Sequence, residues 1–243
     1  TWNGLAMMST LRSHQKRCGC GRFRSNFWHQ RTQMGKSTKY IFQHIHKCGG
    51  TSISKTFRDH PDFIFSIPRE GSFVHGTAST HIEQYVWDQA IKFTIVRNPY
   101  DRAVSAYKMI CKPTSLIPNK WRRIFPSFLA FARFLNNANL NSHSAPRDVL
   151  TKEYIKSIDN VIHHCSTFSN PKYRIDEMDE ILRIESLEED FKRAFKGTSL
   201  MDYELQHANK TFVKPFSEFY CDESRELIEG AYGGDIERFS YEF

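Results

Sequence analysis

The sequence feature that most constrains the fold is a β-prone run that leads straight into a glycine-rich turn. Residues 40–45 (YIFQHI) favour a strand, and residues 46–52 (HKCGGTS) follow with two adjacent glycines. Residues 53–57 (ISKTF) can then begin a helix. A strand, a tight turn and a helix in this order favour anion binding, because the first N–H groups of the helix point outward and the helix dipole places about half a positive charge there.

Strand-like and helix-like patterns alternate along the rest of the chain. The clearest strand covers residues 92–97 (KFTIVR); Asn98 and Pro99 end it, and a helix is predicted over residues 100–111. Further strands are predicted over 62–67, 73–75 and 180–185, and further helices over 80–89, 187–195 and 222–229, with 112–165 mainly helical. This alternation favours an α/β fold of three layers, P-loop-like, with a central parallel sheet flanked by helices.

Positive charge is concentrated near the N-terminus. The formal net charge is +7, yet the first 40 residues contain eight Lys or Arg and no Asp or Glu, so the remainder carries a charge of −1. Residues 1–38 also lack a hydrophobic period, and we predict a basic, irregular tail there, followed by a single domain over residues 39–243. Basic tails can bind nucleic acid, but a solvated extension without a nucleic-acid partner is the simpler interpretation.

The sequence predicts neither a membrane span nor a metal site. No run approaches the roughly 18–20 apolar residues that a transmembrane helix needs, and the first residues are unlike a signal peptide. We therefore expect a soluble protein, either cytoplasmic or a Golgi lumenal domain separated from its anchor. The six cysteines do not show the spacing of zinc ligands, and no metal is expected.

The glycine-rich turn offers the groups that bind a phosphate. Gly49 and Gly50 let the backbone approach an anion, Thr51 and Ser52 add hydroxyl donors, and Lys47 adds a full positive charge. The loop of nucleoside triphosphatases reads G-x-x-x-x-G-K-[ST], whereas here the lysine precedes the glycines. This order argues against a kinase or GTPase. For the loop alone, a plain strand–helix turn remains an alternative.

A second segment, residues 93–107 (FTIVRNPYDRAVSAY), places Arg97 at the end of the predicted strand and Ser105 on the next helix. Together with FQHIHKCGGTSI it resembles the sulfotransferase family that includes the heparan 2-O-sulfotransferases and bacterial and viral relatives. The first loop of that family is close to H-I-P-K-T-G-G-T-S. The chain departs from it at His46, where the family usually has Pro, and at Cys48, where it often has Thr.

The resemblance implies transfer of a sulfuryl group from 3′-phosphoadenosine-5′-phosphosulfate (PAPS) to an acceptor hydroxyl, with release of 3′-phosphoadenosine-5′-phosphate (PAP). Arg97 and Ser105 would bind the 3′-phosphate, and Lys47 would stabilise the leaving group, without a metal. The 5′-phosphosulfate would lie on the loop residues Lys47, Cys48, Gly49, Gly50, Thr51 and Ser52. Weaker likeness in segments 182–191, 207–212 and 231–243 extends the resemblance from about residue 39 to the end.

Further roles follow from the same resemblance. His75, in FVHGTAS, matches the segment that carries the proposed catalytic base of the 2-O-sulfotransferases, and imidazole accepts a proton near neutral pH. Glu83 is the alternative base. Asn209 and Lys210 are expected to close over the nucleotide. Arg102 either assists at the phosphate or forms a surface ion pair.

Two other functions remain open. An ATP-dependent kinase of a nucleotide or small molecule, using the same loop, would prefer Mg·ATP to PAP. A nucleic-acid-binding protein would act through the basic tail, with binding that falls steeply with salt. The preferred hypothesis is a PAPS-dependent sulfotransferase whose acceptor is a glycan or another hydroxyl-bearing small molecule.

Overall fold

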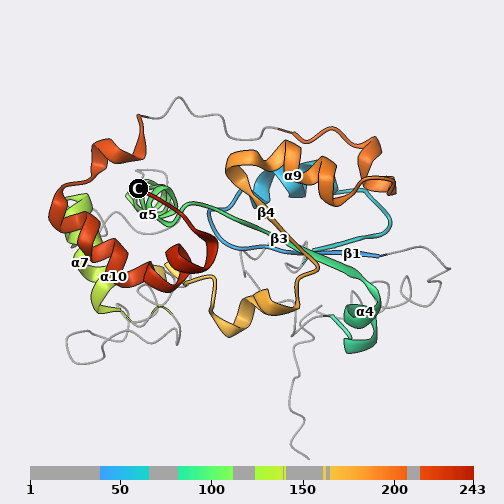
Figure 1. Cartoon of the computed structure of the whole chain (residues 1–243), viewed down its shortest axis with the longest axis horizontal. Coiled ribbons are helices and arrows are strands. Elements are labelled where there is room, and N and C mark those ends of the chain that lie inside the picture. The colour runs from blue at the N-terminus through green and yellow to red at the C-terminus, as the bar shows by residue number, and fades with distance from the viewer. Residues whose placement is uncertain are drawn as a thin grey trace, which may run out of the picture. The chain divides into compact units, whose positions relative to one another are not determined.

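A four-stranded, fully parallel sheet lies at the centre of the fold, in the order β2-β1-β3-β4 (Figure 1). The structure is a computed structural model that describes residues 39–65, 82–111, 124–138, 140, 161–162, 165–206 and 214–243. The strands are β1 (Tyr40–Gln43), β2 (Phe63–Phe65), β3 (Ile91–Val96) and β4 (Glu180–Arg183). The predicted α/β fold with a central parallel sheet is confirmed.

Helices connect and cover these strands. The α-helices are α2 (Gly50–Thr56), α4 (Gln84–Gln89), α5 (Pro99–Ile110), α7 (Phe128–Asn137), α9 (Leu187–Ala194) and α10 (Asp222–Phe239). The 3₁₀ turns are η2 (Pro171–Tyr173), η3 (Ile175–Glu177), η4 (Ile184–Ser186), η5 (Ser199–Asp202) and η6 (Phe216–Phe219). None of the helices within the described ranges is long and apolar enough to cross a membrane.

The alternation of side chains on β1 produces two apolar faces. Tyr40 and Phe42 face a cluster that includes side chains from α9 and the end of α2. Ile41 faces the opposite way and packs with Val86 and Trp87 of α4. Helices therefore cover both faces of the sheet, which gives the three layers expected from the sequence (Figure 1).

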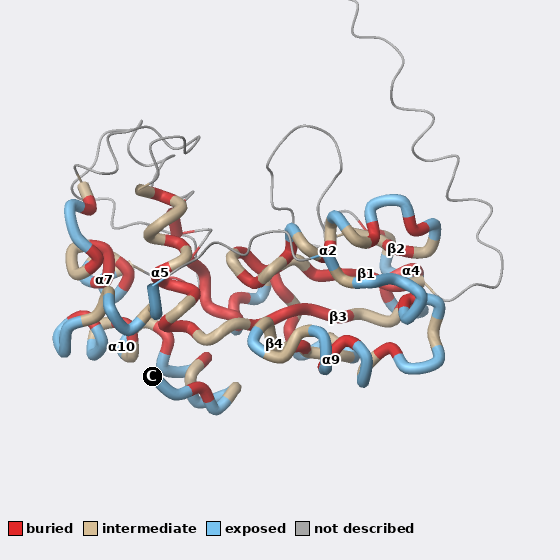
Figure 2. Tube along the Cα trace, turned by 90° about the horizontal axis from the view of Figure 1, so that it is seen from above, coloured by how far each residue is buried: buried red, intermediate tan, exposed pale blue. Residues whose placement is uncertain are grey.

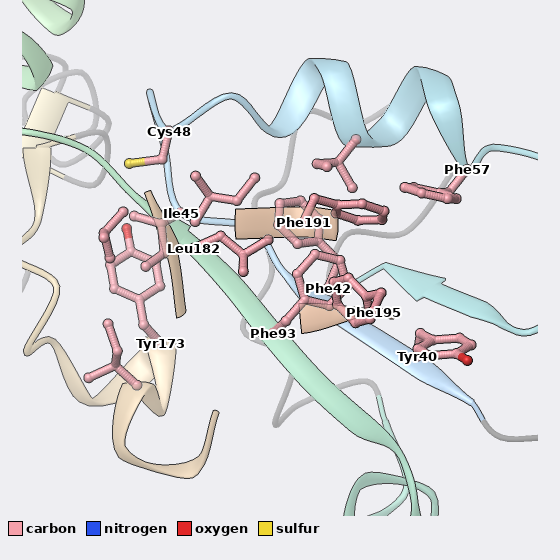
Figure 3. Packing of buried hydrophobic residues seen from close by; sticks show 14 of the residues in the cluster. Tyr40, Phe42, Ile45, Cys48, Phe57, Phe93, Tyr173, Leu182, Phe191 and Phe195 are labelled. Atoms are coloured by element: carbon pink, nitrogen blue, oxygen red, sulfur yellow. The ribbon is translucent and has the colours of Figure 1, made fainter. Parts of the chain in front are cut away.

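The larger face is built largely from phenylalanine (Figure 3). Phe93 of β3 is fully buried, and its ring centroid lies 5.1 Å from that of Phe42 and 4.9 Å from that of Phe195. Phe57, which follows α2, stacks on Phe63 at 4.6 Å. Edge-to-face and offset contacts of this kind add stability beyond the buried area.

A second core lies among α5, α7 and α10 (Figure 1). Phe128, Phe131 and Leu135 of α7 are buried there, and Phe134 is half-buried against them. Local capping explains where α5 begins, because Asn98 accepts a hydrogen bond from the backbone N–H of Tyr100 at 3.0 Å. The chain is mostly buried from β3 into this helix (Figure 2).

Helix α10 runs ten residues beyond the predicted end at residue 229, through three glycines. Tertiary contacts explain the extension. The Tyr232 hydroxyl donates to the carbonyl of Cys165 at 2.6 Å, and Asp235 accepts from the backbone N–H of Phe168 at 2.8 Å. The helix bends at Tyr232, where φ is −123° and ψ is 15°. Helix α4 begins at Gln84, later than predicted, and the predicted strand over 73–75 lies outside the described residues.

Candidate active site

The candidate site lies where β1 and β3 end. From β1 the chain turns through the glycine loop into α2 and on to β2 at one side, whereas β3 pairs with the other side of β1. The strand order therefore changes direction between β1 and β3. Ligands of open parallel sheets bind at such a point, outside the carboxyl ends of the strands.

The loop between β1 and α2 has an unusual backbone conformation. Gly49 has φ +80° and Lys47 has φ +64°, both in the left-handed region. Glycine takes this conformation freely, but for lysine it costs roughly 1–2 kcal/mol. Other contacts must therefore hold Lys47 in place.

Arg97 joins the two segments that the sequence analysis singled out. Its Nη1 donates to the carbonyl oxygen of Lys47 at 3.0 Å, and its Nε and Nη2 donate to Asp101 Oδ2 at 2.9 and 2.7 Å. Asp101 and Ser105 are four positions apart on α5 and share one helix face, and Arg97 bonds to Asp101 from just before the helix. The end of β3 is thus connected directly to the glycine loop.

Arg102 was left open as an assisting group or a surface ion pair, and the surface ion pair is wrong. The residue is only 2% exposed. Its Nε donates to the carbonyl oxygen of His46 at 3.0 Å, and its guanidinium carbon lies 4.6 Å from the centre of the Phe168 ring. No local pattern predicts this burial, because the residues that contact Arg102 are far from it in the chain.

The two loop glycines are required by close neighbours. A Cβ on Gly50 would stand 2.0 Å from atoms of the His44 ring, and one on Gly49 would stand 3.0 Å from Ile184 Cδ1. The His44 ring stacks on Phe42, with centroids 5.9 Å apart. Ile45 and Cys48 extend from the same loop to the edge of the phenylalanine cluster (Figure 3).

Glu185 connects two distant parts of the chain, which no sequence pattern predicts. Its Oε1 accepts from the backbone N–H of Asn98 at 2.7 Å, and its Oε2 accepts from the Tyr241 hydroxyl at 3.3 Å. The end of β4 is thereby tied to the turn between β3 and α5. Glu185 orients this turn through the backbone, over a separation of 87 residues that a local pattern cannot reveal.

Burial shifts the pKa values of two side chains near the loop, Cys48 and Lys172. Burial raises the pKa of the Cys48 thiol to about 11, so Cys48 is a neutral thiol near pH 7. Burial, and then the charge of Arg102, lower the pKa of Lys172 to about 7. The Lys172 ammonium donates to Ser166 Oγ at 2.9 Å and lies over the Tyr173 ring.

The remaining predicted site residues are distributed as follows. Thr51 is exposed and Ser52 is half-buried in the first turn of α2. Glu83 caps the start of α4, where its carbonyl accepts from the N–H groups of Val86 and Trp87. His75, Asn209 and Lys210 lie outside the described residues. Among the residues that are described, no group of three or more His, Cys, Asp or Glu is placed to hold a metal ion.

These features define a class of protein before any comparison. A parallel α/β sheet carries an anion-binding type of loop after its first strand and an arginine at the end of the neighbouring strand, as in proteins that bind phosphorylated nucleotides. The chain belongs to the sulfotransferase family, whose model matches residues 30–242. It is accordingly a PAPS-dependent sulfotransferase. Neither the curated proteins nor the solved structures include a significant match.

The close approach of Gly50 to His44 generates a prediction about stability. Gly50→Ala should lower the free energy of unfolding by about 1–3 kcal/mol, because the new methyl group overpacks against the His44 ring. Urea denaturation of the purified variants measures the change. The substitution should cost less than half as much in a His44→Ala background, where the ring is gone.

Gly233→Ala is the matched control, because this helical glycine has open space where a Cβ would stand. It should raise the free energy of unfolding by about 0.5–1 kcal/mol through helix propensity. An equal loss for Gly50→Ala with and without His44 would contradict the packing argument.

The lowered pKa of Lys172 predicts a pH-dependent stability. Between about pH 7 and pH 10.5 the unfolded chain binds a proton that the folded chain does not, so this group makes stability rise with pH across that window. Below about pH 7 the penalty is complete. Lys172→Met should therefore increase stability, relative to the original chain, more at about pH 6 than at about pH 9.5.

Urea midpoints of the two proteins at the two pH values measure this difference. Lys196→Met, at an exposed lysine, controls for the loss of one positive charge. A stability difference between Lys172→Met and the original chain that does not change with pH would contradict the lowered pKa of Lys172.

Proposed function

We propose that the loop after β1 binds the 5′-phosphosulfate of PAPS, while Arg97 and Ser105 bind its 3′-phosphate. The hydrogen bond from Arg97 Nη1 to the Lys47 carbonyl carries this proposal, because it brings the two cationic segments together at one edge of the sheet. PAPS carries phosphates on both the 3′ and the 5′ oxygen of a single ribose. A site for it needs two cationic groups at short separation.

The proposed chemistry is an in-line displacement at sulfur. The S–O bond to the 5′-phosphate breaks as a bond forms between sulfur and the acceptor oxygen, and negative charge builds on the departing PAP. Lys47 places its ammonium at that charge, and the N–H groups at the start of α2 assist it. The protein then contributes mainly orientation and charge stabilisation, and the scheme uses no metal.

The acceptor hydroxyl must lose a proton as it attacks, and we assign this task to His75. Support comes from the likeness of FVHGTAS to the segment that carries the proposed base in the 2-O-sulfotransferases. Imidazole is suited to the task because it titrates near neutral pH. Asn209 and Lys210 are assigned to the closing of the nucleotide site on the same kind of support.

The acceptor is proposed to be a hydroxyl group of a carbohydrate. The support is the likeness of the two phosphate segments to enzymes that act on glycans. In the same proposal, residues 39–243 form one sulfotransferase domain that follows a basic segment over residues 1–38.

Calorimetric titration with PAP tests the donor site. PAP should bind with a micromolar or lower dissociation constant without added metal, and more tightly than Mg·ATP. Arg97→Ala should weaken PAP binding by about 10-fold or more, since a charge-assisted hydrogen bond contributes roughly 1.5–3 kcal/mol. Lys47→Ala should bind PAP more nearly normally but transfer sulfate about 10²–10³-fold more slowly.

Arg133→Ala is the control, because Arg133 is exposed and pairs with Glu223 on the surface. It should leave PAP binding unchanged. Binding of Mg·ATP in preference to PAP would show that the loop serves a kinase.

His75→Ala tests the base separately from the donor site. The variant should bind PAP as the original chain does, yet transfer sulfate to a glycan about 10²–10⁴-fold more slowly. Radiolabelled PAPS and a panel of desulfated glycans provide the assay. Turnover close to that of the original chain would reassign the base, with Glu83 as the next residue to replace.

A further inference from the structure

The peptide groups on both sides of the Lys47 Cα are held by two arginines, Arg97 just before α5 and Arg102 within it. The carbonyl of the preceding peptide group, on His46, accepts from Arg102 Nε at 3.0 Å. The carbonyl of the following peptide group, on Lys47 itself, accepts from Arg97 Nη1 at 3.0 Å. Rotation about φ of Lys47 would turn the first of these carbonyls away, and rotation about ψ would turn the second.

These two hydrogen bonds hold the backbone of Lys47 in a conformation that is unfavourable by itself. Lys47 has φ +64°, which L-residues other than glycine avoid at a cost of roughly 1–2 kcal/mol. Two charge-assisted hydrogen bonds are sufficient to offset that cost. Cys48 Sγ adds a weak donor to the same His46 carbonyl, at 3.4 Å.

The burial of Arg102 is difficult to explain as a contribution to stability alone. It is fully buried, and within the described residues its Nη1 and Nη2 make no hydrogen bond. A guanidinium has five N–H donors, and buried donors without partners reduce stability, so an apolar side chain of the same size would cost less. What an apolar side chain would lose is the donor to the His46 carbonyl.

Arg102 reaches that carbonyl in one fixed orientation. Its guanidinium carbon lies over the Phe168 ring, 4.6 Å from the ring centre, and α5 itself is capped by Asn98. Arg97, in contrast, is partly exposed and is also bound to Asp101, so it is placed to respond to a ligand. The two arginines thus have different tasks on the same loop.

We propose that Arg102 is a positioning residue that acts on Lys47 through the His46 carbonyl, and so sets the place of the Lys47 ammonium during sulfuryl transfer. This inference rests on the proposed function of Lys47 as the group that stabilises the departing PAP. Arg102 itself does not touch PAPS. Its removal should lower the rate of the chemical step and leave the affinity for PAP nearly unchanged.

Arg102→Met tests the proposal, with hydrolysis of radiolabelled PAPS as the assay, so that water is the acceptor and no glycan needs to be known. At saturating PAPS the rate of sulfate release should fall about 10–100-fold, the effect expected when a reacting group is displaced by about 1 Å. The dissociation constant of PAP should stay within about threefold. Arg102→Lys, which keeps a donor for the carbonyl, should recover part of the lost rate.

A double-mutant cycle shows whether Arg102 acts through Lys47. If it does, Arg102→Met should have little further effect on the rate in a Lys47→Ala background. Val104→Ala is the matched control for stability, because Val104 is buried on the same helix in the core formed with α7 and α10. It should lower the melting temperature without changing the rate.

Three outcomes would overturn the proposal. The first is a normal rate in Arg102→Met or, if the methionine variant does not fold, a loss of PAP affinity in Arg102→Lys that is as large as its loss of rate. The second is a rate loss that is equally large with and without Lys47. The third is a normal rate in Lys47→Ala, which is read from that single variant and removes the proposed role of Lys47 together with any role in positioning it.

Discussion

The parallel pairing of β1 with β3 is the constraint on which the site depends. Gln43 lies opposite Thr94, and the Thr94 hydroxyl donates to the Gln43 carbonyl at 2.8 Å. Lys47 follows the first of these residues by four positions, and Arg97 follows the second by three. A shift of register would separate the loop from the arginine that contacts it and would also turn buried side chains to the wrong face. One ladder of hydrogen bonds therefore sets the packing and the chemistry together.

The buried guanidinium of Arg102 connects parts of the chain that are otherwise separate. It extends from α5, which belongs to the core of α5, α7 and α10, to the loop and to Phe168, which belongs to the core over the sheet. Asp235 of α10 lies close enough for the charge of Arg102 to oppose the rise that burial causes in its pKa. The same side chain thus couples the packing of two hydrophobic cores to the backbone of the glycine loop.

Patterns within short segments were sufficient to predict the sheet, the glycine loop and the start of α5. Asn98 and Pro99 mark the end of one strand and the start of the next helix, and the two adjacent glycines mark the turn after the first strand. The burial of Arg102 and the partners of Glu185 were not predictable, because those contacts join residues 56 and 87 positions apart. The length of α10 was not predictable for the same reason: the distant partners of Tyr232 and Asp235 outweigh the low helix propensity of its glycines.

The pair formed by Arg97 and Asp101 has a consequence for how the site meets a ligand. The arginine already holds a single rotamer, with its Nε and Nη2 on one carboxylate oxygen and its Nη1 on the loop. Ordering a free arginine side chain costs up to about 2 kcal/mol of rotamer entropy, and here folding has met that cost before any anion arrives. In the proposed donor site Arg97 is therefore preorganised, and the selectivity of that site would depend on which anions can bind a cation that already has two partners.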